Sequence, residues 1–272
     1  MENNSSQPRF VALSFDIEEF DLPRERRVPI SVDRQLEVSS EGLSVILDLL
    51  RGMGVRATFF CTAFYAENCP WLISRIVADG HEVASHSYNH SKFDKADLLL
   101  SREKLEQLTG LRVRGYRAPR MAEVSPSDLL AAGYSWDSSL NPCFLPGRYN
   151  NFKAPVMAYR SAEGLIEIPA SVSPLLRLPL FWLSLHNMPL SVYTYLARRA
   201  LKRTSFLNLY FHPWEFSEQL TNSQFRVPFY ITRNSGSKLA RRLATFICSL
   251  QRDPLVRFVT LSEYVSGCDH LK

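Results

Sequence analysis

Residues 80–90 read GHEVASHSYNH, in which two histidines, His86 and His90, follow a short apolar run at Val83–Ala84. The run is typical of the end of a buried strand. If the chain turns helically after Ser85, the two imidazoles lie on one helix face, one turn apart, and can reach a single metal ion. A histidine pair alone is weak support for a metal site, because histidine is common on helix surfaces, so the rest of the chain has to decide.

Strand-like and helix-like segments alternate along the chain on both sides of this stretch. Strands are expected at 10–15, 57–61, 82–85, 113–116, 134–136, 165–168, 207–211 and 256–260. Helices are expected at 39–54, 63–78, 96–108, 125–133, 189–202 and 238–251. A charged loop is expected up to about Val38, and residues 141–163 read as an irregular insertion. About seven strand–helix alternations indicate an α/β fold, either a (β/α) barrel or a doubly wound sheet.

Polar side chains that could carry chemistry come directly after several of the expected strands. They are Asp16, Glu18, His86, His90, Arg117, Asp137 and His212. In a barrel the carboxyl ends of all strands meet at one mouth, so these groups can converge. In an open sheet only the groups at the switch point would meet.

Composition indicates one globular domain. The chain has 272 residues, of which 46% are hydrophobic, and this is enough to bury a full core. Residues 1–9 are polar and are expected to be a disordered tail, and residues 10–272 are expected to form the domain. The net charge of +5 suits acidic partners, but no nucleic-acid-binding signature is present.

The cysteines and the N-terminus indicate a reducing compartment. Five cysteines without a CxxC pair predict neither a disulfide framework nor a zinc ribbon. The first ten residues, MENNSSQPRF, contain no apolar segment typical of a secretory signal, and no apolar run approaches 18 residues. The cytoplasm is therefore the expected location.

Five short motifs, in chain order, resemble those of the polysaccharide deacetylases, carbohydrate esterase family four. They are SFDIEE at 14–19, HSYNH at 86–90, YRAPR at 116–120, WDSS at 136–139 and YFHPWE at 210–215. The resemblance extends over roughly residues 10–262. It implies a distorted (β/α) barrel of about seven strands and a divalent metal, usually zinc, at the barrel mouth. It also implies hydrolysis of N-acetyl groups from amino sugars.

The resemblance assigns the metal ligands only in part. His86 and His90 match two ligands of the family, but the position where the common motif has a ligating Asp is Ile17. Relatives with a D-x-E spacing use the carboxylate two positions after the base, and residues i and i+2 of a strand share a face. Glu18 is therefore the expected third ligand, and Glu19 is the alternative.

The resemblance also assigns roles in proton transfer. Asp16 matches the general base, Arg117 the residue that pairs with this base and keeps it ionised, and the backbone N–H of Arg120 the oxyanion donor. His212 matches the general acid, for which an ordinary histidine pKa is suitable. Asp137 matches the carboxylate that orients the acid, although Ser138 or Glu215 could do the same.

These groups fit the chemistry of amide hydrolysis, which needs an activated water, a stabilised oxyanion and a proton for the departing amine. The sequence therefore predicts a metal-dependent hydrolase that deacetylates amino sugars of a saccharide or a saccharide precursor. The alternatives are a hydrolase of another C–N or ester bond on the same fold, and a catalytically silent sugar-binding relative.

One apolar segment, Pro174–Leu185 (PLLRLPLFWLSL), is not explained by the motifs. It carries Arg177 and is too short to span a bilayer. It is either an internal helix covered by the barrel or a surface for lipid or a partner, with Leu176, Leu178, Leu180, Phe181, Trp182 and Leu185 exposed. Four cations follow it, Arg198, Arg199, Lys202 and Arg203. Peripheral attachment to the inner membrane face, near the active-site mouth, and a lipid-linked or nucleotide-linked substrate are the corresponding hypotheses.

Overall fold

The computed structural model describes residues 7–91, 93–145, 149–268 and 271. Its main sheet has seven parallel strands in the spatial order β10 (Phe206–Phe211), β1 (Arg9–Ile17), β2 (Thr58–Cys61), β3 (Glu82–Ser85), β4 (Gly115–Tyr116), β5 (Trp136–Asp137) and β9 (Ile166–Glu167). An antiparallel edge strand, β8 (Tyr159–Arg160), pairs with β9, and β11 (Val256–Phe258) pairs with the start of β1. A small hairpin, β6 (Phe144–Leu145) and β7 (Tyr149–Asn150), lies in the expected insertion.

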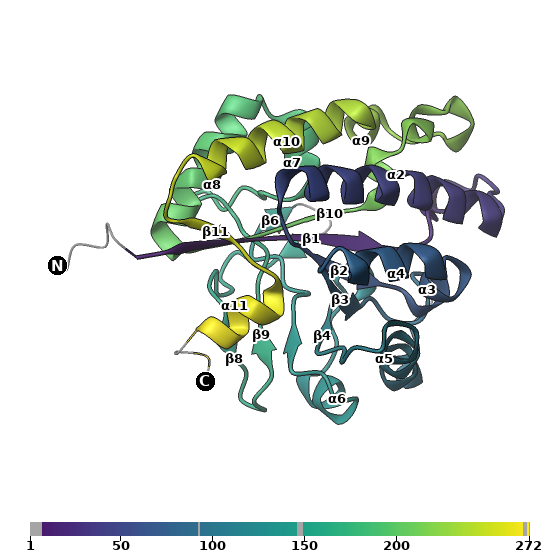
Figure 1. Ribbon diagram of the computed structural model, residues 1–272, viewed down its shortest axis with the longest axis horizontal. Coiled ribbons are helices and arrows are strands. Elements are labelled where there is room, and N and C mark those ends of the chain that lie inside the picture. Colours follow the sequence, from purple (N-terminus) through teal and green to yellow (C-terminus); the bar gives the residue numbers. More distant parts are fainter. Residues whose placement is uncertain (1–6, 92, 146–148, 269–270, 272) are drawn as a thin grey trace.

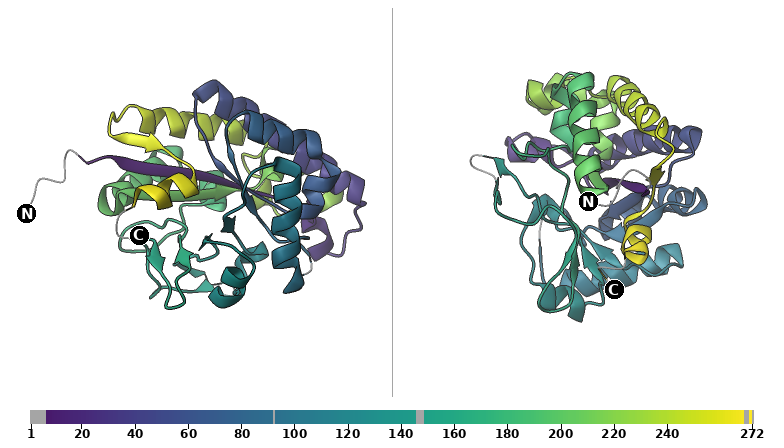
Figure 2. Two further views of the ribbon diagram at one scale, coloured as in Figure 1. Left: turned by 60° about the horizontal axis from the view of Figure 1, so that its bottom comes forward. Right: turned by 90° about the vertical axis from the view of Figure 1, so that its left-hand side faces the viewer.

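The sheet curls into an incomplete barrel, so the predicted distorted (β/α) barrel is confirmed (Figures 1 and 2). Residues 168–171, rather than a strand ladder, join β9 to β10 within the described residues. The N–H of Ser171 donates to the carbonyl of Asn208 (2.9 Å), and Nδ2 of Asn208 donates to the carbonyl of Ile168 (3.1 Å). The buried side chain of Asn208 thus provides some of the hydrogen bonds that a ladder between β9 and β10 would otherwise make.

Helices surround the sheet. They are α1 (Leu22–Glu25), α2 (Val32–Met53), α3 (Ala63–Asn68), α4 (Pro70–Ala78), α5 (Ala96–Thr109), α6 (Pro126–Ala131), α7 (Trp182–Asn187), α8 (Leu190–Thr204), α9 (Phe229–Thr232), α10 (Ser237–Gln251) and α11 (Leu261–Gly267). In Figure 1, α2 and α10 run side by side along β1, and α11 lies near the C-terminus on the other side of it. The expected helix at 63–78 is interrupted at Cys69, because Pro70 begins a new helix. No helix among the described residues is long and apolar enough to cross a membrane.

Two boundaries at the N-terminal end differ from the sequence prediction. Helix α2 begins at Val32, where a loop was expected, because Ser31 caps it by accepting a hydrogen bond from the N–H of Arg34 (3.3 Å). Residues 1–6 of the expected tail lie outside the described residues, but Arg9 already belongs to β1 and pairs with Asp253 (2.7 Å).

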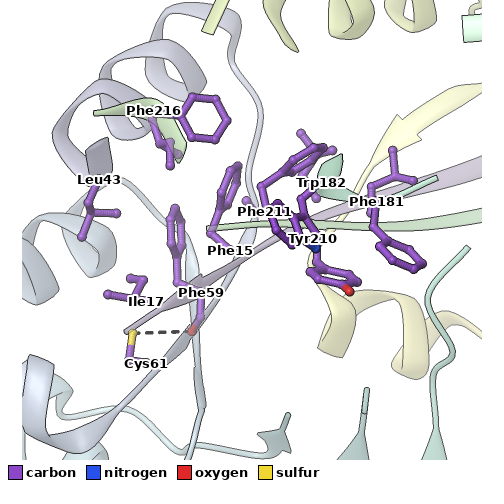
Figure 3. Close-up of a cluster of buried hydrophobic side chains, with 14 of the residues drawn as sticks. Phe15, Ile17, Leu43, Phe59, Cys61, Phe181, Trp182, Tyr210, Phe211 and Phe216 are labelled. Atoms are coloured by element: carbon purple, nitrogen blue, oxygen red, sulfur yellow. Dashed lines mark hydrogen bonds between the residues drawn. The ribbon is translucent and has the colours of Figure 1, made fainter. Parts of the chain in front are cut away.

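Alternate side chains of β1 face opposite sides of the sheet. Phe15 and Ile17 point outward into a large cluster that includes Phe59 of β2, Leu43 of α2 and Phe216, with the rings of Phe15 and Phe59 stacked at 5.2 Å (Figure 3). This cluster attaches α2 to the outside of the barrel.

A second cluster fills the barrel interior and the end where the strands begin. It contains Ala12, Phe60, Ala84, Trp136, Ile166, Ile168, Phe206, Leu261 and Tyr264. Helix α11 supplies Leu261 and Tyr264 and is tied to β2 by a hydrogen bond from the N–H of Leu261 to Oγ1 of Thr58 (2.9 Å). This end of the barrel is mainly apolar, although Oγ1 of Thr58 also donates to Oε2 of Glu82 there (2.7 Å).

Close packing at Gly42 of α2 sets the position of the short 3₁₀ turn Pro213–Phe216 after β10. A Cβ at Gly42 would lie 1.8 Å from the carbonyl oxygen of Pro213. Only glycine permits this approach, and the turn that it positions follows His212 directly.

Candidate active site

Three buried side chains at the barrel mouth converge on one point. Oε2 of Glu18 lies 3.3 Å from Nε2 of His86 and 3.0 Å from Nε2 of His90. The three ligand atoms all lie within 4.8 Å of one another. Glu18 follows β1, and both histidines follow β3, so the carboxyl ends of two separate strands build the cluster.

The two histidines reach this point through a loop and not through a helix, so the expected helical turn after Ser85 is wrong. Residues 86–90 have no helical assignment, and Ser87 adopts the left-handed conformation (φ 66°). The loop reverses the chain and turns both rings toward the same side, with ring centroids 5.8 Å apart.

Hydrogen bonds on the other side of each ring fix the tautomers. His86 donates through Nδ1 to the carbonyl of Arg117 (2.8 Å), and His90 donates through Nδ1 to Oδ2 of Asp21 (3.1 Å). In the neutral rings this leaves the Nε2 lone pairs facing Glu18. Oε2 of Glu18 is itself buried without a hydrogen bond of good geometry. Three acceptor atoms directed at one point fit a bound cation, and two imidazoles with one carboxylate are a donor set typical of zinc.

Of the two candidates for the third ligand, Glu18 faces the histidines and Glu19 does not. Glu19 is directed away from the cluster, where its Oε2 accepts a hydrogen bond from Thr62 (3.3 Å), and burial raises its pKa. Burial alone would raise the pKa of Glu18 too, but when His90 and His212 are protonated their charges outweigh burial and hold the pKa of Glu18 well below its ordinary value. Glu18 also accepts a hydrogen bond on Oε1 from the indole of Trp214 (3.0 Å).

Asp16 lies two residues before Glu18 and is held by a fully buried arginine. Nη1 of Arg117 donates to Oδ1 of Asp16 (2.6 Å) and to the hydroxyl of Ser14 (2.9 Å). The guanidinium carbon lies 4.0 Å from the ring centre of Phe60 inside the barrel. The other Asp16 oxygen lies 4.0 Å from Nε2 of His212. The predicted pairing of Asp16 with Arg117 is therefore present in the geometry.

The carboxylate next to His212 is Glu215, and the expected contact of Asp137 with His212 is wrong. Oε1 of Glu215 accepts hydrogen bonds from Nδ1 (2.8 Å) and from the backbone N–H of His212 (2.5 Å). The second of these bonds, from the backbone N–H of the N-cap residue His212 to the side chain of Glu215, is part of a capping box around the 3₁₀ turn. Ser138, the remaining alternative, bonds to Arg117 and Asn208 instead.

Asp137 lies at the end of β5 and belongs to a different buried pair. Its Oδ1 accepts hydrogen bonds from the backbone N–H of Ser138 (2.8 Å) and the hydroxyl of Ser139 (2.6 Å). Burial raises the pKa of Asp137 to about 6, and burial together with Asp137 raises that of the neighbouring Glu167 well above its ordinary value. These two carboxyl groups share one site in which only one can easily be ionised.

Two residues of the site were not identified from the sequence. Asp21 supports His90, and its Oδ2 also accepts hydrogen bonds from Ser91 (2.7 Å) and Arg120 (3.1 Å). His186 donates to Oε2 of Glu215 (2.7 Å). Glu215 had been only an alternative. A fourth acidic position in DIEEFD, and the H-x-x-E spacing of a capped turn, are the signals that could have indicated Asp21 and Glu215.

The electrostatic surroundings of His212 favour its protonated form. Burial alone would lower its pKa, but the charge of Glu18, followed by the hydrogen bond and the charge of Glu215, outweighs burial, so the pKa of His212 is raised. Burial would raise the pKa of Glu215, but hydrogen bonds from His186 and His212 lower it.

A cavity of about 200 Å³ connects these groups to solvent. Its floor carries Asp16, Glu18, His86, His90 and His212, and its wall is aromatic, with Trp182, Tyr210, Trp214 and Tyr230. The ring of Trp214 stacks on His212 (4.8 Å between centroids), and Trp182 meets His212 edge to face (5.2 Å). Arg120 lies at the rim, where it pairs with Asp21 and Glu25, in a backbone conformation with φ 58°.

Comparison with known proteins finds similarity to one enzyme family. Residues 3–132 match the family model of the polysaccharide deacetylases. A peptidoglycan deacetylase from Helicobacter pylori is 31% identical over 121 residues, which are 41% of this chain and 41% of that relative. A chitooligosaccharide deacetylase from Sinorhizobium fredii is 51% identical over 45 residues, which are 16% of this chain and 21% of that relative. The matched segments thus span less than half of the length of these curated relatives.

The same barrel occurs among solved structures. A Mycobacterium smegmatis protein assigned to the polysaccharide deacetylases superimposes with a TM-score of 0.67 at 22% identity. The superposition covers 97% of this chain and 91% of that chain. At this level of identity the likeness concerns the fold.

Proposed function

Because this chain belongs to the polysaccharide deacetylase family, we propose that it is a metal-dependent hydrolase that removes N-acetyl groups from amino sugars of a saccharide or a saccharide precursor. The observation that carries the proposal is the meeting of three groups in one cavity. They are the Glu18, His86 and His90 cluster, the Asp16–Arg117 pair and the His212–Glu215 pair.

Glu18, His86 and His90 are the residues that would hold the metal. A divalent ion bound by three protein ligands with an open position lowers the pKa of a bound water and polarises a carbonyl group. Zinc is the ion we propose, because imidazole and carboxylate donors suit it.

Asp16 is the proposed general base. Its carboxylate accepts a proton from the attacking water, and the buried Arg117 at 2.6 Å keeps this carboxylate ionised and fixes its direction. Attack of the water on the acetyl carbon places negative charge on the carbonyl oxygen. The backbone N–H of Arg120 is the proposed donor to that oxygen.

His212 is the proposed general acid. Because Nδ1 donates to Glu215, the Nε2 atom is the one that faces Asp16 and the cavity. Nε2 gives its proton to the amine nitrogen as the C–N bond breaks, which releases acetate and the free amino sugar. Trp182 and Trp214, which line the cavity, are the proposed contacts for the apolar face of a pyranose ring.

Acetate release from a panel of substrates tests this function. We expect zinc-loaded protein to release acetate from acetylated amino-sugar oligosaccharides, or from nucleotide-linked or lipid-linked acetylated amino sugars. We also expect chelation to abolish the release and added zinc to restore it. O-acetylated sugars and cyclic amides form the comparison arms.

The arms of this panel distinguish the candidate activities. Turnover confined to the ester or cyclic-amide arm would assign the chain to another hydrolase class on the same fold. Saccharide binding by metal-loaded protein without acetate release from any substrate would instead contradict the enzyme and indicate a silent sugar-binding relative.

A further inference from the structure

An apolar loop protrudes between Val172 and Pro179, which form an isolated antiparallel bridge. At its tip, Leu175 and Leu176 have 84% and 72% of their surface exposed, and these two residues are called the leucine tip below. Leu178, also expected at the surface, is 37% exposed. The remainder of the expected apolar surface is wrong, because Leu180, Phe181, Trp182 and Leu185 are buried. Figure 3 shows Phe181 beside Tyr210, on which its ring stacks at 4.7 Å.

The leucine tip is held in place by its own backbone and by an arginine. Leu175 and Arg177 both have left-handed φ angles (56° and 49°), positions that usually carry glycine or asparagine. Arg177 folds back, donates to the carbonyl of Ala154 (2.7 Å) and lies 5.2 Å from the half-exposed ring of Phe152. The anchored turn therefore holds two leucine side chains in solvent. Polar side chains at these positions would lose no packing contacts, so the fold itself does not require leucine there.

The last turns of α8 carry four cations, Arg198, Arg199, Lys202 and Arg203, which form the basic face of α8. All four are exposed, and none has a carboxylate partner within the described part of the chain. Arg198 donates to the carbonyl of Ser249, which leaves its charge uncompensated.

Leu175 of the leucine tip and Arg203 of the basic face of α8 border the same hollow. A cavity of about 290 Å³ is lined by Leu175 and Arg177 on one side and by Ala200, Arg203 and Thr204 of α8 on the other. An apolar projection thus lies directly beside unpaired positive charge.

We propose that this surface docks onto an anionic lipid bilayer, with the leucine tip in the headgroup region and the basic face of α8 against the lipid phosphates. Charge complementarity identifies the partner, because four uncompensated cations beside an apolar tip match an interface that offers anions and hydrocarbon together. A folded protein partner would need its own apolar pocket and its own acidic patch in the same arrangement.

The docking surface is distinct from the active site. The cavity between the leucine tip and α8 lies near the start of β10, whereas His212 follows its end. The six residues of β10 separate them by roughly 20 Å, at about 3.3 Å per strand residue. The expected position of the apolar segment at the active-site mouth therefore holds only for Trp182 and Leu183. Docking would leave the catalytic cavity open to substrate.

Vesicle flotation of the full chain tests this surface. Vesicles contain either phosphatidylcholine alone or equal parts of phosphatidylcholine and phosphatidylglycerol, at low and at high ionic strength. We expect flotation with the anionic vesicles at low ionic strength, with a marked loss at high ionic strength because salt screens the cations. Arg199→Ser with Lys202→Ser should weaken binding about thirtyfold, and Leu175→Asn with Leu176→Ser about tenfold or more.

Matched variants distinguish docking from general effects of charge and apolar surface. Arg112→Ser with Arg114→Ser removes the same charge from exposed positions elsewhere, and Trp71→Ser removes an apolar side chain that is 62% exposed. Both controls should bind vesicles as the parent chain does. Absence of flotation, equal binding to neutral vesicles, or equal losses in the controls and the docking variants would overturn the proposal. None of these residues lines the catalytic cavity. Loss of vesicle binding in the docking variants therefore tests the docking surface without testing the proposed deacetylase activity.

Discussion

The Nε2 atom of His186 lies 2.7 Å from Oε2 of Glu215, and both side chains are fully buried. The other ring nitrogen of His186 lies 2.7 Å from the carbonyl oxygen of Arg233. A carbonyl oxygen can only accept, and Glu215, whose pKa is lowered, is a carboxylate that can only accept. Acceptor atoms therefore lie on both sides of the His186 ring, and Glu215 is held between two imidazoles, those of His186 and His212.

The contacts of Glu215 with His186 and His212 predict a positioning role for Glu215 and His186. Glu215→Gln removes the negative charge beside His212, so the pKa of His212 should fall. The alkaline limb of the pH profile of kcat/KM, where the acid loses its proton, should then move to lower pH. His186→Gln leaves the Glu215 carboxylate in place but removes an imidazole that competes with His212 for it, so the limb should move in the opposite direction, to higher pH.

A purely structural role would give a different pattern. Unfolding or lower occupancy of active protein reduces kcat at every pH and leaves the limb in place. The profile of each variant, compared with the parent chain at matched metal content, therefore decides between the two roles.

The metal cluster predicts which carboxylate is needed for metal binding. Purified parent chain should contain close to one divalent ion per molecule, and His86→Ala and Glu18→Gln should each contain much less. Glu19→Gln is the matched control and should keep the ion, because Glu19 bonds to Thr62 outside the cluster. Metal content is measured by mass spectrometry after dialysis. Normal metal content in Glu18→Gln, or its loss in Glu19→Gln, would contradict the assignment of Glu18.

Asp16 and His212 should act in proton transfer and not in holding the metal. Asp16→Asn and His212→Ala are each expected to lower turnover by about 10²-fold or more, while metal content stays near that of the parent chain. Near-normal turnover in either variant would remove that residue from the mechanism.

The two glycines of α2 form a matched pair for stability. Gly42→Ala places a methyl group 1.8 Å from the Pro213 carbonyl and should lower the free energy of unfolding by about 2 kcal/mol or more. Gly52→Ala meets no atom within 4 Å and should raise it by about 0.5–1 kcal/mol, because alanine restricts the unfolded chain. Urea denaturation measures both. Equal effects would show that the α2 contact with Pro213–Phe216 is not close packed in solution.

His81 should make stability depend on pH. Its Nδ1 accepts a hydrogen bond from the N–H of Ala57 (3.2 Å), and burial lowers its pKa to about 4. The unfolded chain therefore binds a proton near pH 6.5 that the folded chain does not bind until about pH 4. Between these values stability should fall as the pH falls, by about 1–2 kcal/mol in total.

The variant His81→Asn isolates this contribution. It keeps an acceptor for Ala57 but does not titrate in this range. The difference in free energy of unfolding between the parent chain and the variant should shrink by the stated amount from pH 7 to pH 4. A difference that stays constant over this range would exclude His81 as the titrating group.

The alternation of strands and helices was predictable, but the closure of the barrel was not. Apolar runs mark β1, β2, β3 and β10 clearly in the sequence. The strands β4 and β5 are only two residues long, because the sheet curls sharply there, and residues 168–171 replace a ladder by bonds to Asn208. Such contacts join positions far apart in the sequence, so no local pattern contains them.

The candidate site was predictable where the signal is local. The two-residue spacing of Asp16 and Glu18 gives both residues the same face of the chain at the end of β1, and the structure brings Glu18 to the histidines. The partner of His212 depended on tertiary geometry. The 3₁₀ turn after β10, where residues three apart lie above one another, brings Glu215 back to His212, whereas Asp137 at the end of β5 is turned toward Glu167.

The indole bond from Trp214 to Glu18 joins positions 196 residues apart and has a consequence for folding. The three candidate ligands, Glu18, His86 and His90, all come from the first third of the chain, but the indole that bonds to Glu18 lies in the turn after β10. The ligand cluster therefore cannot reach its final geometry until β10 has docked beside β1. The rate at which a refolding chain acquires tight metal binding should then equal the rate at which its C-terminal part docks. Metal uptake would thus report when the barrel is complete.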